Sequence, residues 1–100
     1  MFKMVRPKKI KIVEKEPKIT YFKPRAVPLS EIQEVTLSLE ELEVMKLKFN
    51  KNLDHEEAAK KMKISRTTIG RILNSAGKKI TDALTNGKAI KIQGGNYKIK

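Results

Sequence analysis

Three helix-start signals between Ser38 and Ser65 constrain the fold of this chain more than any other sequence feature. Ser38 with Glu41, and Asp54 with Glu57, match the capping-box pattern. In that pattern the cap side chain accepts a hydrogen bond from the N3 backbone N–H, and the glutamate accepts one from the cap residue's own N–H. Ser65 is a third cap residue, with Ile64 and Ile69 as its hydrophobic staple. The predicted helices span residues 39–49, 55–62 and 66–86.

The apolar residues of the third segment recur in steps of one, three or four, which is typical of one face of an amphipathic helix. They are Ile69, Ile72, Leu73, Ala76, Ile80, Ala83 and Leu84. Gly77 is a possible bend, at a cost of about 1 kcal/mol relative to Ala, and Gly87 is the predicted stop. In the first segment we expect one inward face, with Asn50 or Asn52 in the left-handed conformation after it. That face comprises Leu39, Leu42, Met45 and Phe49.

The flanking segments have strand character. Residues 10–13 and 19–23 are rich in strand formers, 30–34 suggests one helical turn, and 89–92 with 97–99 suggests a hairpin around Gly94-Gly95-Asn96. An isolated hairpin is marginal in water, so we expect these strands to pair with the N-terminal ones, within one chain or between two. The fold class predicted is mainly α, a three-helix helix-turn-helix domain with short N- and C-terminal β-strands. Its parts are a basic arm and strands (1–37), the helical domain (38–87) and a C-terminal tail (88–100).

Charge is strongly positive and unevenly distributed. The 100 residues carry 23 Lys/Arg and 11 Asp/Glu, a net charge of +12. Residues 1–25 contribute +7, residues 26–49 contribute −3 and residues 50–100 contribute +8. Such segregation favours a basic binding face and a polyanionic partner.

Other functional classes find little support in the sequence. Without Cys and with His55 alone, we expect no disulfide, no metal site and no cofactor. No catalytic residues are predicted, so we do not expect an enzyme, and His55 is expected to be exposed or phosphate-facing. Tyr21 and Phe22 are expected in the core rather than as a stacking platform. No secretory signal or membrane-length apolar run is evident, and a cytoplasmic protein is the default expectation.

Residues 54–76 carry the functional prediction. Ala58 and Ala59 are small enough for a close helix crossing, and Ile64, Ile69 and Ile72 supply an aliphatic wedge around a three-residue turn. The other face of the second helix is free of acidic residues and suits the major groove. Predicted base contacts are Thr67, Thr68, Arg71 and Asn74; predicted phosphate contacts are Ser65, Arg66, Ser75, Lys78 and Lys79. Lys63 occupies the turn position most often held by Gly, where a left-handed Lys costs about 1–2 kcal/mol. The turn is therefore expected to be either slightly strained or of a variant geometry.

Several runs of sequence resemble known families. Residues 39–47, 56–59 and 64–73 resemble the helix-turn-helix of sigma-factor region four. A broader match is to a family of predicted DNA-binding proteins, domain of unknown function one hundred thirty-four. It rests on Arg6-Pro7, Tyr21-Phe22-Lys23-Pro24, Pro28-Leu29-Ser30-Glu31, Arg71-Ile72-Leu73-Asn74-Ser75-Ala76, Asn86-Gly87-Lys88-Ala89-Ile90 and Gly94-Gly95-Asn96-Tyr97. This resemblance implies sequence-specific DNA binding.

The leading prediction is a transcriptional regulator that binds double-stranded DNA, with the helix starting at Arg66 in the major groove. A homodimer formed through the terminal strands is expected, because one recognition helix reads few base pairs. Two alternatives stay open: an RNA- or ribosome-associated basic protein, and a sigma-like module that contacts the transcription apparatus.

Overall fold

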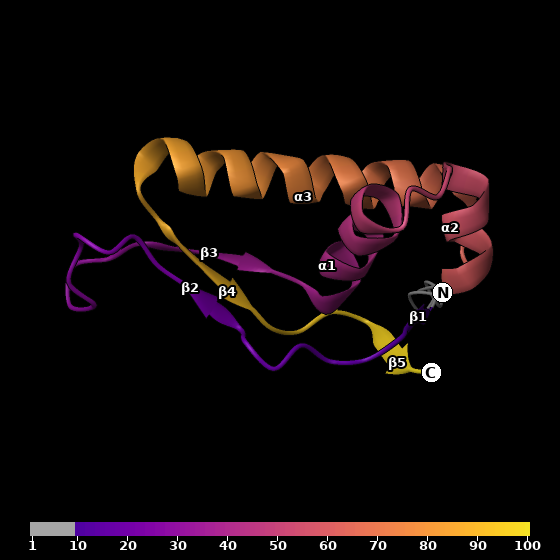
Figure 1. Cartoon of the computed structure of the whole chain (residues 1–100), viewed down its shortest axis with the longest axis horizontal. Coiled ribbons are helices and arrows are strands. Elements are labelled where there is room, and N and C mark those ends of the chain that lie inside the picture. Colours follow the sequence, from indigo (N-terminus) through magenta and orange to yellow (C-terminus); the bar gives the residue numbers. More distant parts are fainter. Residues whose placement is uncertain (1–9) are drawn as a thin grey trace, which may run out of the picture.

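A single long helix lies over a layer of short strands, with two shorter helices packed near its start (Figure 1). The computed structural model describes residues 10–100, so the basic arm expected at 1–9 lies outside the described residues. The elements, in chain order, are β1 (Lys11–Val13), β2 (Tyr21–Phe22), β3 (Glu34–Leu37), α1 (Leu39–Met45), a π-helical turn η1 (Lys46–Asn50), α2 (His55–Met62), α3 (Arg66–Asn86), β4 (Ala89–Ile92) and β5 (Tyr97–Ile99). Three helices with short strands agree with the predicted mainly α class.

The helix-start signals form the hydrogen bonds that their residues predict. Both halves of the capping box are present at Ser38 and at Asp54. Ser65 caps α3 by accepting from the backbone N–H of Thr68, and Gly87 ends α3 in the left-handed conformation with φ 65°. The helix between them is continuous through Gly77, so the possible bend does not occur.

The first helix departs from its prediction at its C-terminal end. After Met45 the chain widens into η1, where the N–H of Lys51 donates to the carbonyl of Lys46 at 3.0 Å. A π turn holds more residues than an α turn, so the apolar face rotates away from its α-helical position. Leu47 is buried, whereas Phe49 is 66% exposed and its predicted inward position is wrong. Asn52, with φ 57°, takes the predicted left-handed conformation.

The strands pair through long-range contacts. β4 lies between β3, which is parallel to it, and antiparallel β2, while β1 pairs with β5 in parallel. The predicted hairpin of the tail is therefore wrong, because β4 and β5 belong to different sheets. Gly94 and Gly95 both have positive φ, and the carbonyl of Gly94 accepts from the N–H of Leu39. These glycines carry the chain past α1 to β1 instead of reversing it.

The segment before α1 was also predicted incorrectly. The helical turn predicted for residues 30–34 does not form: residues 29–31 make only a turn, in which the N–H of Glu31 donates to the carbonyl of Pro28 at 3.0 Å, and β3 begins at Glu34. Its hydrogen-bond partner is β4, with Leu37 opposite Ile92. A strand partner so distant in sequence leaves no local pattern, and this explains the error.

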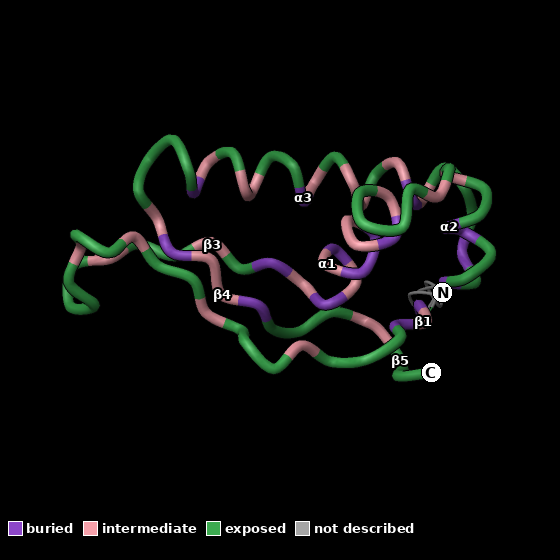
Figure 2. Tube along the Cα trace, in the orientation of Figure 1, coloured by how far each residue is buried: buried purple, intermediate pink, exposed green. Residues whose placement is uncertain are grey.

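Two buried clusters meet on the inner face of α3, which Figure 2 shows as alternating buried and half-buried positions. Ile69 belongs to a cluster with α1, η1 and α2, and Ala76 belongs to one with β3 and β4. Leu84, predicted inward, is 76% exposed although the adjacent Ala83 is only 2% exposed, so the buried face at the end of α3 is narrower than the predicted apolar stripe. Phe22 is 53% exposed and Tyr21 donates its hydroxyl to Glu34, so the core packing expected for this pair is wrong.

Candidate nucleic-acid interface

Helices α2 and α3 pack closely because their contact residues are small or completely buried. Ala58 has 0% exposure and Ala59 has 5%, and Ile69 of α3 has 0%. Met62 and Ile64 belong to the same buried cluster. The prediction that small residues lie at the crossing, with aliphatic residues around them, is confirmed.

The turn between α2 and α3 is a Schellman motif with lysine in the usual place of glycine. Lys63 has φ 56° and ψ 46°. The N–H of Ile64 donates to the carbonyl of Ala59 at 3.0 Å, and the N–H of Lys63 donates to that of Lys60 at 3.3 Å. Those two bonds define the motif, and the residue after the left-handed position is commonly apolar. Ile64 is that residue and is buried, so the turn holds the start of α3 in one direction.

The first turn of α3 uses two predicted contact residues internally. Ser65 Oγ accepts from the backbone N–H of Thr68 at 3.1 Å and lies 2.8 Å from Thr68 Oγ1. Thr68 is half-buried, whereas Ser65 is exposed. Both hydroxyls therefore stabilise the start of the helix, which limits Thr68 as a base contact.

The outward face of α3 carries four exposed side chains at helical spacing, Thr67, Arg71, Asn74 and Lys78. None of them forms a side-chain hydrogen bond or ion pair within residues 10–100. Arg66, at the start of the same helix, is exposed as well. No acidic residue occurs between Glu57 and Asp82. The surface is thus basic, hydrogen-bonding and unoccupied by neighbouring side chains of the described chain.

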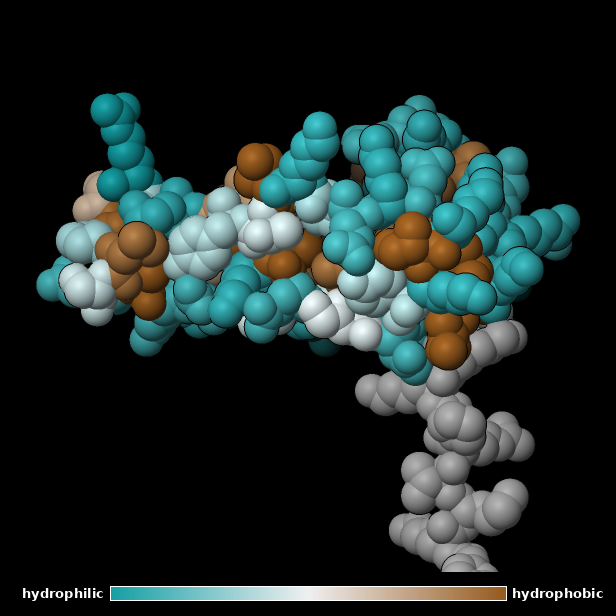
Figure 3. Space-filling model, turned by 90° about the horizontal axis from the view of Figure 1, so that it is seen from below, coloured by the Kyte–Doolittle hydropathy of each residue, from teal (hydrophilic) through white to brown (hydrophobic). Residues whose placement is uncertain are grey.

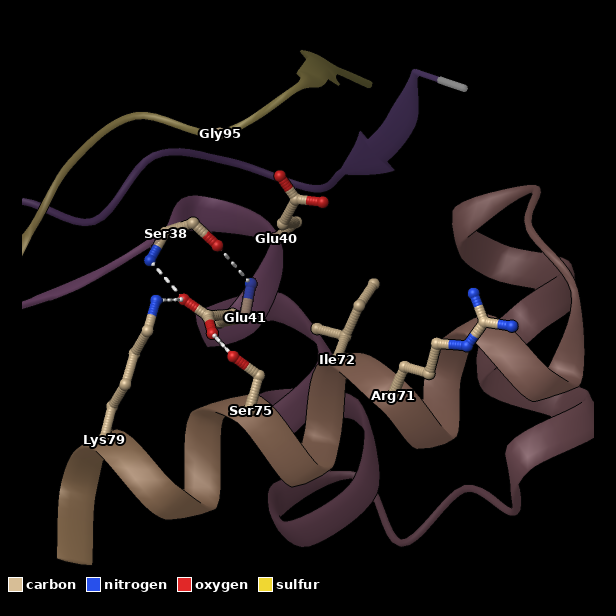
Figure 4. Close-up of a pocket in the computed structure, with 8 residues that line it drawn as sticks. All are labelled: Ser38, Glu40, Glu41, Arg71, Ile72, Ser75, Lys79 and Gly95. Carbon is tan, nitrogen blue, oxygen red and sulfur yellow. Dashed lines mark hydrogen bonds and ion pairs between the residues drawn. The ribbon is translucent and has the colours of Figure 1, made fainter. Parts of the chain in front are cut away.

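Two further predicted contacts point instead toward α1, as Figure 4 shows. Glu41 Oε2 accepts from Ser75 Oγ at 2.6 Å, and Glu41 Oε1 accepts from Lys79 Nζ at 2.7 Å. The backbone N–H of Ser38 donates to the same carboxylate at 2.8 Å. Ser75 and Lys79 thereby join α1 to α3, and a phosphate would have to compete with Glu41 for both side chains. Arg71, drawn in the same view, takes no part in this cluster.

The Glu41 carboxyl is held ionised. Burial raises its pKa, but hydrogen bonds from Lys79, Ser38 and Ser75 together lower it more, and the pKa lies below its ordinary value of 4.5. Sequence reasoning identified Glu41 only as the N3 residue of a capping box. The spacing of Ser75 and Lys79 on one flank of α3 was the available sign of a second role.

His55, the first residue of α2, contacts α3 at Gly70 and not at its outward face. Its ring is half-buried, and a β-carbon placed on Gly70 would lie 3.8 Å from two ring atoms. That separation is an ordinary van der Waals contact, so the packing of α2 on α3 does not require glycine at position 70. His55 was expected to be exposed or to face a phosphate, and it is instead half-buried.

Within residues 10–100 no group of three His, Cys, Asp or Glu side chains is arranged to hold a metal ion. None of the described helices is both long and apolar enough to cross a membrane.

The fold and this surface define a small, basic, mainly helical protein in which a long helix presents a polar outer face. The chain belongs to the family described as Protein of unknown function DUF134, whose model matches residues 1–100.

The chain is also similar to several members of the UPF0251 group. One, from Caldanaerobacter subterraneus subsp. tengcongensis, is 54% identical over 96 residues, which is 96% of this chain and 81% of the relative. Another, from Thermoanaerobacter pseudethanolicus, is 52% identical with the same coverage of both chains. A third, from Moorella thermoacetica, is 53% identical over 94% of this chain and 63% of the relative. No solved structure matches the chain.

Proposed function

We propose that this protein binds duplex DNA in a sequence-specific way and regulates transcription. In this proposal α2, the turn and α3 form a helix-turn-helix that resembles sigma-factor region four, and α3 enters the major groove. The observation that carries the proposal is the outward face of α3, which holds exposed Arg71 and Asn74. A helix with its side chains is about 10–12 Å wide, and the major groove is about 12 Å wide.

The two central side chains suit different bases. Arg71 matches the O6 and N7 acceptors of guanine, and Asn74 matches N6 and N7 of adenine. Thr67 is placed to meet a phosphate or a thymine methyl group. Arg66 and Lys78 flank these residues on the same helix and suit phosphates, which position a protein without reading sequence.

A dimer would extend the site, because two copies read half-sites about 34–36 Å apart. The strands expected at the dimer interface pair within the chain, β1 with β5 and β2 with β4. Any contact between copies through this region therefore has to use the outer surface or free edges of these small sheets.

Selection of binding sites from random duplex DNA, followed by titration of variants, tests the proposal. Arg71→Ala should weaken binding to the selected site by about 1–3 kcal/mol and change binding to random DNA little. Lys78→Ala should weaken binding to the selected site and to random DNA alike, and it should reduce the salt dependence of binding by about one counterion. Lys98→Ala, which removes the same charge from exposed β5, is the matched control and should leave the affinity for both DNAs and the salt dependence unchanged.

The proposal fails if no sequence is selected, or if Arg71→Ala leaves the preference intact. Tight binding to single-stranded or structured RNA would instead favour the RNA-associated alternative. Binding to RNA polymerase without a DNA footprint by this chain alone would favour a module that contacts the transcription apparatus.

A further inference from the structure

A second surface, away from the outward face of α3, has the composition of a ligand site. A half-enclosed cavity of about 320 Å³ lies where β1, η1 and α2 meet. Ligand pockets generally measure about 300–1,000 Å³ and combine apolar walls with a few polar groups. The apolar wall here is formed by Ile12, Leu47 and Leu53.

Charge at the cavity is positive once internal pairs are considered. Its two acidic side chains, Glu14 and Glu43, both pair with Lys46, at 2.9 Å and 3.2 Å. The hydrogen bond from Lys46 is the main cause that lowers the pKa of Glu14. Lys46 therefore offsets one of the two negative charges. Together with Lys46 and the three lysines described next, the side-chain charges around the cavity sum to +2.

Three more lysines line the same cavity, Lys51, Lys61 and Lys100. All three are exposed, and none forms an ion pair within the part of the chain that the structure describes. They come from the residue directly after η1, from α2 and from the segment after β5, and the fold brings Lys100 next to the other two. An apolar wall beside unpaired ammonium groups complements a molecule with an aliphatic body and an anionic head.

We propose that this cavity binds a small organic anion, a carboxylate or phosphate attached to a short aliphatic chain. The aliphatic chain lies against the apolar wall, and the head lies among the three lysines. An occupant would contact β1, η1 and α2 together and would stabilise the folded chain by mass action. This inference is independent of DNA binding, because none of the proposed DNA contacts lines the cavity.

Hexanoate and hexyl phosphate are suitable probes, with hexanol and hexylamine as neutral and cationic controls of the same chain length. Titrated into the full chain and followed by amide NMR, either anion should cause saturable shifts centred on Leu47, Leu53 and Lys61. It should also raise the melting temperature. Hexanol should bind at least about threefold more weakly, and hexylamine more weakly still. Preference for one anion identifies the head group.

Two matched double variants test the role of the lysines. Lys51→Gln/Lys61→Gln should weaken anion binding by about threefold to tenfold, as expected for two partly exposed charges. Lys60→Gln/Lys63→Gln removes the same charge next to a separate hollow and should leave binding unchanged. Equal effects of the two variants, equal binding of hexanol and hexanoate, or the absence of saturation would each overturn the proposal. All four lysines are exposed, so both variants should keep the dispersed amide spectrum of the folded chain.

Discussion

Replacement of Lys63 by glycine should stabilise this protein. The left-handed conformation of Lys63, with φ 56°, costs an ordinary L-residue about 1–2 kcal/mol relative to glycine. The side chain is exposed and forms no ion pair within residues 10–100, so its removal should change the free energy of unfolding little. Glycine adds an entropic cost of about 0.5–1 kcal/mol because its unfolded chain is more flexible. The conformational term is larger, and the net gain should be about 0.5–1 kcal/mol.

Thermal and urea unfolding followed by circular dichroism would measure this gain. For a domain of 60–100 residues, 1 kcal/mol corresponds to a shift of about 4–8 °C, so Lys63→Gly should raise the melting temperature by about 2–8 °C. Lys63→Ala removes the same charge but keeps the β-carbon, and should give almost none of this gain. Asn52→Gly, at φ 57°, should gain less than Lys63→Gly because Asn tolerates this conformation. An equal gain in Lys63→Ala, or a loss in Lys63→Gly, would refute the conformational argument.

Two further predictions concern the contacts that hold α1. Glu41→Gln should lower the free energy of unfolding by about 1–3 kcal/mol, because Lys79 and Ser75 lose a charged acceptor. The lower end of this range applies if solvent screens the partly exposed Lys79. Since the pKa of Glu41 is lowered on folding, its contribution is complete above about pH 4.5 and disappears as the pH falls through the folded value. Urea midpoints measured at neutral and acidic pH should therefore converge between the wild type and this variant, and a constant difference would contradict the assignment. Gly95→Ala should destabilise by about 1–3 kcal/mol, because φ is +111° and the new β-carbon would lie 2.8 Å from Glu40 Oε1. In Gly77→Ala the new β-carbon would meet nothing within 4 Å, so this variant should be more stable by about 1 kcal/mol. Equal changes in stability at the two glycines, measured by the same unfolding assay, would show that backbone conformation and available space do not determine the effect.

The local helix signals could be read from the sequence because their hydrogen bonds join residues three or four positions apart. The boxes at Ser38 and Asp54, the cap at Ser65 and the stop at Gly87 are all of this kind. For Lys63 the sequence left two outcomes open, a strained left-handed residue or a turn of variant geometry, and the structure has the left-handed residue. The outward position of Arg71 follows from the same periodicity that places Ile69 inside.

The strand pairing, the π turn and the Glu41 cluster could not be predicted in this way. β3 forms because β4, far along the chain, supplies its partner, and the same pairing prevents the hairpin expected around Gly94. Ser75 and Lys79 face α1 only because α1 crosses α3 at their level.

The amino-acid sequence alone determined where α2 and α3 begin and end, and which side of α3 is polar, because short-range hydrogen bonds and helical periodicity act within a few residues. Only the tertiary structure decided which polar side chains on α3 remain free, and which lysines gather around the cavity beside β1. Those outcomes depend on contacts between residues distant in the chain, which no local pattern encodes.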